Sequence, residues 1–484
     1  MKIAQLILTY FALFFVFSAC SSGKPDPLTG IKGRKYIRPM SPPNMAVIPG
    51  GSFEMGVSED ISHSNIANKR MVTVSPFYMD ETEMTNNKYR QFVMAVLDSS
   101  ARLYAAEKGY IYREEYFITK DEAGSDLVVD LGFASYPVDW SVKFDFQKSD
   151  AIEPDGVNDL LKYFYHTSGK DGGKLALNAD HLIYQYYWID YNKVLEGRAN
   201  QDFVAAPVTD IAARTSVDED DEEDEEDDED NEAPLKVAKE EVNALNLERY
   251  MREEAVPIYP DVLVWLTDFP GSFNEPLLEQ YFDHPAYDDY PVVGINWRQA
   301  RAFTYWRTSL VNRSTLAKNR SGLEQRFRLP TEAEWEWAAR GGINNSPYPW
   351  GTTYIRDNRG CFMANFKPYR GRYSGEKGVV LLPVDSYVAN QYGLYNMAGN
   401  VAEWTSATFH ESSYEFVLDM NPNFEYMSNP EDPITLKRKV VRGGSWKDIS
   451  YYLQTGSRSF EYEDTARSYI GFRTVQSYLG IPRK

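Results

Sequence analysis

Three short signatures in the last third of the chain decide its fold: Gly399-Asn400-Val401-Ala402-Glu403-Trp404, Arg442-Gly443-Gly444-Ser445-Trp446 and Gly471-Phe472-Arg473. No cysteine lies within these signatures or after them. Shortly after the second signature the chain instead carries Asp448 and Leu453. As a combination, the three signatures and the missing cysteines carry more information than any other part of the sequence.

The signatures together resemble the formylglycine-generating enzyme (sulfatase-modifying factor) family. This resemblance implies an α+β fold, the C-type-lectin-like formylglycine-generating-enzyme fold, with low regular secondary structure. The family's oxidase activity depends on a cysteine pair whose soft thiolates hold copper. Asp448 and Leu453 occupy the two cysteine positions, and Ser445 matches a serine of that site without an activating base. We therefore expect a pseudoenzyme without the catalytic cysteine pair and with no catalytic residue.

The same resemblance extends to two further blocks. The run Met45 to Gly56 predicts two short strands around a Pro-Gly-Gly turn, and Thr85 is placed to cap a helix whose inward face carries Tyr89, Phe92, Val93, Val96 and Leu97. The domain resumes at Tyr290, where Asn296 can cap the next helix. Thr331 and Glu334 form a capping-box pattern before a helix that Gly341 ends.

Composition predicts a folded protein with one long insertion. At 484 residues, with 43% apolar and 14% aromatic content, the chain can bury a large core. The formal charge is −20, but Asp218–Glu232 carries fourteen acidic residues, so the rest of the chain has a charge of only −6. No basic stripe indicates nucleic acid. Expected domains are a lipoprotein signal peptide at 1–19, a lipid-anchored tether at 20–43, the family domain at 44–97 and 290–480, and an insertion at 98–289 with a disordered acidic loop at 216–234.

The N-terminus predicts a lipid anchor. Ile3 to Phe17 is almost wholly apolar, and small residues precede Cys20. An uncleaved membrane anchor is the alternative, but the apolar stretch is shorter than the ~20 residues that span a bilayer. We expect lipidation of Cys20 and a position at the periplasmic face of the outer membrane, since residues 21–24 lack an acidic export signal.

Only Cys361 would then remain as a thiol, which excludes a disulfide framework. We expect Cys361 to be a small buried or half-buried residue. The five histidines are scattered, so zinc, haem and iron–sulfur sites have no support.

Calcium is the one cofactor that the family resemblance implies. The first implied site has Asn396 and Glu403 as side-chain ligands, with the carbonyls of Gly399 and Val401; all-oxygen ligands suit this cation. The second would use Asn365, the carbonyl of Phe366 and Glu376. Alternatively, Asn396 and Glu403 satisfy backbone groups in a tight loop without metal. Calcium would staple loops and take no part in catalysis.

The anchor, the emptied site and the insertion are similar to gliding-motility lipoproteins of the GldK/PorK type, from the type IX secretion system. That resemblance implies self-assembly into a periplasmic ring with a GldN/PorN-type partner. A protein of the GldJ type is the alternative within this group. We expect the insertion to form the interface with partners. The alternatives are a calcium-dependent glycan-binding lipoprotein and a protein-modifying oxidase.

Overall fold

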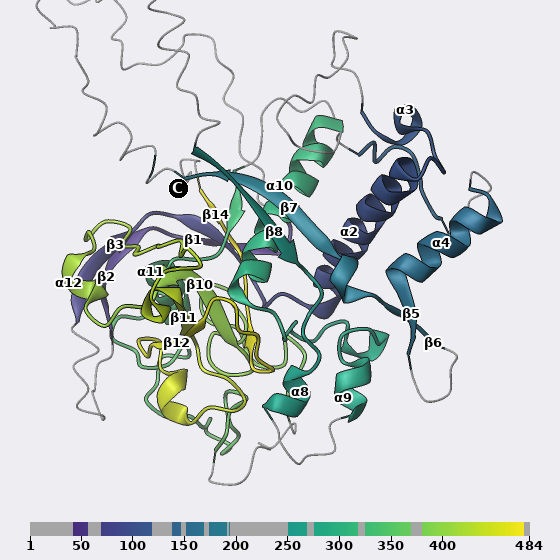
Figure 1. Cartoon of the computed structure of the whole chain (residues 1–484). Coiled ribbons are helices and arrows are strands. Elements are labelled where there is room, and N and C mark those ends of the chain that lie inside the picture. Colours follow the sequence, from purple (N-terminus) through teal and green to yellow (C-terminus); the bar gives the residue numbers. More distant parts are fainter. Residues whose placement is uncertain are drawn as a thin grey trace, which may run out of the picture. The chain divides into compact units, whose positions relative to one another are not determined.

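The first and last strands of the domain lie in the same antiparallel sheet, with β4 between them (Figure 1). Its order is β1 (Met45–Ile48), β4 (Phe77–Asp80), β14 (Val475–Ser477) and β9 (Phe327–Arg328). Met79 pairs with both Ala46 and Val475. The end of the domain therefore closes against its beginning, although nearly 400 residues of sequence separate them.

The structure is a computed structural model that describes residues 42–56, 69–118, 138–146, 152–168, 174–190, 193, 250–268, 275–317, 325–368 and 380–478. These residues belong to one unit, Pro42–Tyr478. The expected signal peptide, Cys20, nearly all of the tether, the acidic loop 216–234 and Glu376 lie outside the described residues. No helix among the described residues is long and apolar enough to cross a membrane.

A second sheet assembles the three signatures. Its order is β12 (Ser459–Tyr462), β11 (Arg438–Arg442), β10 (Ala402–Thr408) and β13 (Ile470–Gly471). Glu403 pairs with Arg442 on one side and with Gly471 on the other. Every residue of β10 is buried, so Glu403 lies inside the protein where the three signatures meet.

The remaining strands form three two-stranded antiparallel hairpins. β2 (Gly51–Met55) pairs with β3 (Arg70–Val74), β5 (Tyr165–Ser168) with β6 (Lys174–Leu177), and β7 (Ile183–Ile189) with β8 (Met251–Pro257). The two strands expected in Met45–Gly56 are therefore confirmed as β1 and β2, although they belong to different sheets.

Three helices begin at the predicted caps. α2 (Asn86–Glu107) is capped by Thr85 and α11 (Glu332–Arg340) by the Thr331–Glu334 capping box. Before α10 (Trp297–Ala317), Asn296 Oδ1 accepts from the Gln299 N–H at 2.9 Å. The expected domain boundary after residue 97 falls inside α2, because its buried face continues with Ala101 and Ala105.

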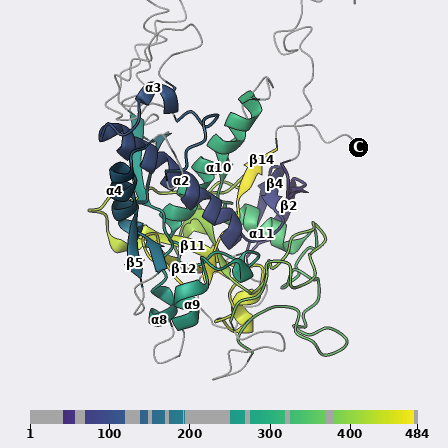
Figure 2. The same cartoon turned by 90° about the vertical axis from the view of Figure 1, so that its right-hand side faces the viewer.

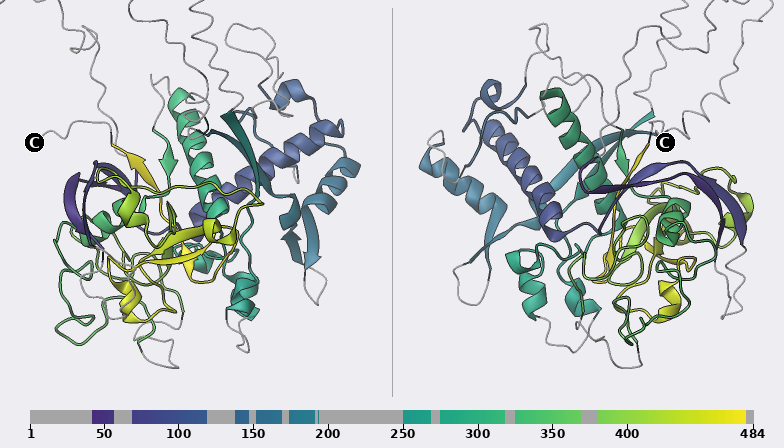
Figure 3. Two further views of the ribbon diagram at one scale, coloured as in Figure 1. Left: turned by 60° about the vertical axis from the view of Figure 1, so that its left-hand side comes forward. Right: turned by 180° about the vertical axis from the view of Figure 1, so that it is seen from behind.

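Part of the expected insertion packs onto the domain (Figures 2 and 3). α4 (Pro154–Phe164) lies beside α2, and the β7–β8 hairpin lies over α10. Tyr186, at the centre of the run Tyr184-Gln185-Tyr186-Tyr187-Trp188 on β7, is 4% exposed and belongs to the hydrophobic core. The remaining elements are α3 (Arg113–Tyr116), η2 (Ala179–His181), α8 (Val264–Thr267), α9 (Glu275–Gln280), η4 (Pro285–Tyr287), α12 (Ser413–Phe416), η5 (Ile434–Lys437) and η6 (Ser450–Leu453).

Much of the domain has no regular secondary structure, as expected. Between α11 and β10, the described residues 341–368 and 380–401 contain no helix or strand. Left-handed residues shape these loops, among them Asn396, Gly399 and Asn400. The mixed α+β fold with low regular structure is confirmed.

Candidate functional site

The buried carboxylate of Glu403 is the centre of the site. Arg473 grips both of its oxygens, with Nε to Oε2 at 2.7 Å and Nη2 to Oε1 at 2.6 Å. The indole N–H of Trp335 donates to Oε2 at 2.7 Å. Glu403 and Arg473 are each 0% exposed, so this bidentate pair is fully desolvated. It ties the first and third signatures together.

A second buried carboxylate, Glu83, faces the same loop. The side-chain amides of Asn396 and Asn400 donate to its two oxygens at 3.1 and 3.0 Å. Burial raises the pKa of Glu83 to about 8; Arg473 opposes this shift and the charge of Glu403 adds to it. Two carboxylates thus share one guanidinium, and ionisation of both would leave an excess negative charge.

Sequence reasoning missed Glu83 as a site residue. Its only signal in the sequence was its place two residues before the predicted helix cap Thr85. The contact to Asn396 spans 313 residues of sequence, so no local pattern could reveal it.

The loop expected to bind calcium contains one buried oxygen atom that is suited to a cation. Asn396 is 6% exposed, and its Oδ1 is buried without a hydrogen-bond partner. Asn396 and Gly399 have φ of +50° and +79°, which bends the loop sharply. Glu403 Oε1 accepts one described hydrogen bond and keeps a lone pair, whereas Oε2 accepts two. Oxygens of Asn396 and Glu403, with the negative charge nearby, suit a hard cation.

The second expected calcium site adjoins the first. Asn365 Nδ2 donates to the Val380 carbonyl at 2.9 Å and lies 3.3 Å from Asn400 Oδ1. Phe366 is buried in an apolar cluster. Glu376 lies outside the described residues. Among described residues there is no group of three or more His, Cys, Asp or Glu side chains that could hold a metal.

Asp448 and Leu453, the two residues expected at the positions of the family's cysteine pair, have other roles in the structure. The Ser445 hydroxyl donates to Asp448 Oδ2 at 2.6 Å. Burial raises the pKa of Asp448, while the bonds from Ser445 oppose the rise. Leu453 is 0% exposed and packs with Tyr348 and Phe366 in an apolar cluster.

The prediction that Cys361 is buried or half-buried is wrong. Cys361 is exposed, on the wall of a cavity of about 680 Å³ that Trp350, Phe362 and Tyr387 also line. It ends a tight turn in which Asp357 Oδ1 accepts from its N–H at 2.9 Å, and this turn directs it outward. No histidine lines the cavity.

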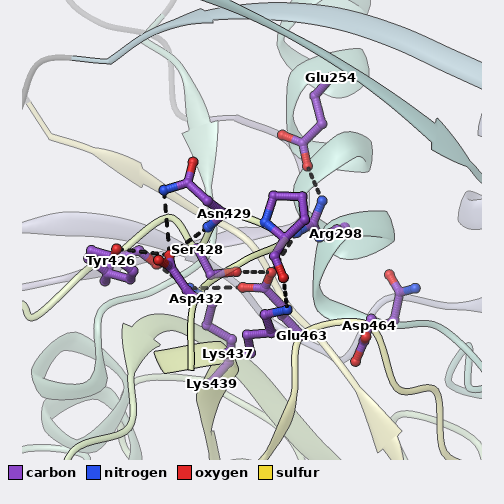
Figure 4. Close-up of polar contacts among 12 residues, drawn as sticks. Glu254, Arg298, Tyr426, Ser428, Asn429, Asp432, Lys437, Lys439, Glu463 and Asp464 are labelled. Carbon is purple, nitrogen blue, oxygen red and sulfur yellow. Dashed lines mark hydrogen bonds and ion pairs between the residues drawn. The ribbon is translucent and has the colours of Figure 1, made fainter. Parts of the chain in front are cut away.

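An ion-pair network centred on the buried Glu463 joins the segment expected to be an insertion to the rest of the domain (Figure 4). Glu463 Oε1 accepts from Arg298 at 2.6 Å and from Ser428 at 2.5 Å. Lys439, 0% exposed, lies 3.5 Å from Glu463 Oε2, and burial lowers its pKa to about 8. Arg298 also reaches Glu254 of β8 at 3.9 Å.

The next turn of α10 strengthens the same attachment. Arg301 donates to Glu254 at 2.7 Å and lies 4.5 Å from the ring of Trp188. Tyr186 packs on Tyr305 with 4.3 Å between ring centroids. The β7–β8 hairpin is thereby held on α10 by charge and aromatic contacts together.

Comparison with known proteins establishes the family. The family described as sulfatase-modifying factor enzyme 1-like domain matches residues 35–135 and 197–478, which is more than half of the chain. The chain belongs to this family. The match also covers parts of the segment expected to be an insertion, 98–289. Proteins of the family commonly bind calcium.

Curated relatives include active and inactive members. The chain is 33% identical to the formylglycine-generating enzyme of Bos taurus over 201 residues, 40% of this chain and 45% of that protein. It is 32% identical to that of Thermomonospora curvata over 230 residues, 44% and 65% of the two chains. The inactive C-alpha-formylglycine-generating enzyme 2 of Bos taurus is 29% identical over 191 residues, 38% and 50%. The chain thus spans less than two thirds of each of these relatives.

Among solved structures, PvdO from Pseudomonas aeruginosa is similar, with a TM-score of 0.39 and 14% identity over 90% of this chain and 94% of that one.

Proposed function

We propose that this chain is a non-catalytic, lipid-anchored structural subunit of the type IX secretion and gliding-motility machinery, of the GldK/PorK type. It would lie on the periplasmic face of the outer membrane, build a ring by self-assembly and bind a GldN/PorN-type partner. One observation carries the proposal: the scaffold that joins the three signatures at Glu403 is complete, while Asp448 and Leu453 fill the cysteine positions.

The pseudoenzyme assignment follows from ligand chemistry. A carboxylate hydrogen-bonded to Ser445 and a buried leucine cannot supply two soft thiolates to Cu(I). The inactive relative shows that this family contains members without the activity.

Calcium would act in this proposal as a structural staple. Asn396, Gly399, Val401 and Glu403 would hold it, with Glu83 beside them. A bound cation would neutralise the carboxylates that share Arg473 and would fix the loop between α11 and β10. The rigid loops would then present constant surfaces to partners.

Purification from membranes in mild detergent tests the proposal. We expect a large assembly that contains a second periplasmic secretion component, identified by mass spectrometry. Cys20→Ser should release the chain from the membrane fraction. Recovery of the wild-type chain as a monomer under several gentle conditions would contradict the ring-subunit proposal.

The glycan-binding alternative has a separate discriminator. It requires saturable sugar binding that a calcium chelator abolishes, and the family's calcium binding is what favours it. The oxidase alternative requires copper binding by the purified chain at a site that includes neither Asp448 nor Leu453.

A further inference from the structure

The cavity beside Cys361 combines aromatic walls with carboxylates. Its volume of about 680 Å³ lies within the range of about 300–1,000 Å³ that is usual for ligand sites. Residues between 349 and 363 form one part of its lining, and residues between 385 and 398 form the other. It adjoins the expected calcium loop through Asn396, but neither Asp448 nor Leu453 lines it. The cavity is therefore distinct from the expected positions of the family's cysteine pair.

Trp350 gives this cavity a rigid aromatic face. Its ring stacks on that of Tyr348, with 4.9 Å between the centroids and 7° between the planes. The indole N–H donates to the Tyr354 carbonyl at 2.8 Å, so it is already paired within the protein. Because Tyr348 covers one face of the indole, the opposite face is the one left for a ligand, and the face of a tryptophan attracts a cation.

The charged side chains that line the cavity have a negative sum. Asp357 and Asp385 are carboxylates and Arg359 is a guanidinium, which leaves a net charge of −1. The N–H groups of Arg359 and Cys361 donate to Asp357 Oδ1, each at 2.9 Å, and fix this carboxylate in its turn. Within the described residues, Asp357 Oδ2 and the carboxylate of Asp385 accept no hydrogen bond. These oxygens are available to a cationic donor.

Large apolar side chains are exposed at the rim of the cavity. Val388 lines it and is 92% exposed, and Tyr354, whose carbonyl accepts from Trp350, is 74% exposed. A small molecule inside the cavity would leave both side chains in water. A protein that inserts one side chain would cover them as well. The rim therefore favours an anchor side chain of a partner protein over a free small molecule.

We propose that this cavity binds an arginine side chain of a partner protein. The guanidinium would stack on Trp350 and donate to Asp357 and Asp385. The residues that flank the arginine would cover Val388 and Tyr354. Arginine fits better than lysine because its planar group both stacks on an aromatic face and donates in a fork. This deepens the structural-subunit function and rests on it only in that the chain acts by binding proteins.

Three labelled peptides of the same length test the inference on the purified chain by fluorescence anisotropy. They differ only at the central residue, which is Arg, Gln or Glu, and valines flank it on both sides. We expect the Arg peptide to bind at least about tenfold more tightly than the other two, a difference of about 1.4 kcal/mol. Equal affinities, or a preference for the Glu peptide, would overturn the inference.

A competition experiment separates a protein partner from a small molecule. N-acetylarginine amide carries the same guanidinium without the flanking valines, so it should displace the labelled Arg peptide only at concentrations at least about tenfold higher than the unlabelled peptide needs. Equal potency of the two competitors would mean that the rim takes no part in binding, and it would overturn a protein as the occupant.

Three variants at exposed positions locate the binding. Asp385→Asn removes a carboxylate from the cavity and should weaken binding of the Arg peptide about threefold to fivefold. Arg359→Ala removes a repelling cation and should strengthen binding. Glu279→Gln, at a carboxylate of α9 away from the cavity lining, should leave it unchanged. Equal loss in Asp385→Asn and Glu279→Gln, or weaker binding in Arg359→Ala, would overturn the inference.

Cys361 reports directly whether the cavity is occupied. In the Cys20→Ser chain it is the one remaining cysteine, and it is exposed on the cavity wall. The Arg peptide at saturation should slow alkylation of Cys361 by N-ethylmaleimide, whereas the Glu peptide at the same concentration should not. Alkylation at the full rate in the presence of bound Arg peptide would place the binding elsewhere and overturn the inference.

The outcomes also separate this inference from the proposed function. A wild-type chain that prefers the Arg peptide and yet purifies only as a monomer supports the arginine cavity and contradicts the ring subunit. A large assembly together with no preference among the peptides supports the ring subunit and overturns the arginine cavity.

Discussion

Replacement of the buried Lys439 by methionine should change the pH dependence of stability. Burial lowers the pKa of Lys439 from 10.5 to about 8, so the unfolded chain binds this proton more tightly than the native protein does. Between these two values the unfolded state holds more protons, and stability therefore rises with pH. Below pH 8 the native protein holds Lys439 in its charged form in a buried position. This lowers the free energy of unfolding by about 3 kcal/mol.

Lys439→Met removes that cost and also removes contacts. The ammonium lies 4.2 Å from the ring of Trp297 and donates to the Thr408 hydroxyl at 3.2 Å. Glu463 keeps Arg298 and Ser428 as partners. Replacement of buried ions by apolar groups is often neutral or stabilising by about 1–4 kcal/mol. We expect Lys439→Met to be at least as stable as the wild type at pH 7.

Urea unfolding at pH 7 and pH 10 measures the effect. From pH 7 to pH 10, the free energy of unfolding of the wild type should rise by about 2 kcal/mol relative to that of Lys439→Met. Lys162→Met, at an exposed lysine on α4, is the control and should show no such trend. A difference between Lys439→Met and wild type that stays constant from pH 7 to pH 10 would refute the reasoning, because it would mean that native Lys439 keeps an ordinary pKa.

Three further predictions concern the Glu403 site. Arg473→Met should destabilise the protein by about 3–5 kcal/mol in urea unfolding, because Glu403 and Glu83 stay buried without their guanidinium; a loss under about 1 kcal/mol would contradict the pairing. Gly399→Ala should lower the free energy of unfolding more than Gly393→Ala does. Both glycines have positive φ, so each substitution has a conformational cost of about 1–2 kcal/mol. In addition, a Cβ at Gly399 would lie 2.4 Å from the Asn365 carbonyl oxygen, whereas one at Gly393 meets nothing within 4 Å. Calcium at about 100 times its Kd should stabilise the wild type by about 2.7 kcal/mol and Asn396→Ala much less; equal stabilisation of both would exclude Asn396 as a ligand.

Local sequence patterns predicted the helix starts correctly. Thr85, Asn296 and Thr331 each accept from the backbone N–H three residues ahead, an interaction that depends only on nearby residues. The inward face of α2 was likewise readable, because helical spacing places Tyr89, Phe92 and Val96 on one side. Family resemblance supplied the fold class, which local patterns alone would not have given.

Sequence by itself thus determined the fold class and the caps of the main helices, and it predicted that Asp448 and Leu453 stand where the family resemblance implies a cysteine pair. Only the tertiary structure decided what surrounds Glu403: the approach of Glu83 to Asn396, the capture of Glu403 by Arg473, and the outward direction of Cys361. The physical reason is the sequence separation between the residues in contact. Caps and periodic faces come from contacts within one helical turn, whereas buried charges are paired by strands that meet from opposite ends of the chain.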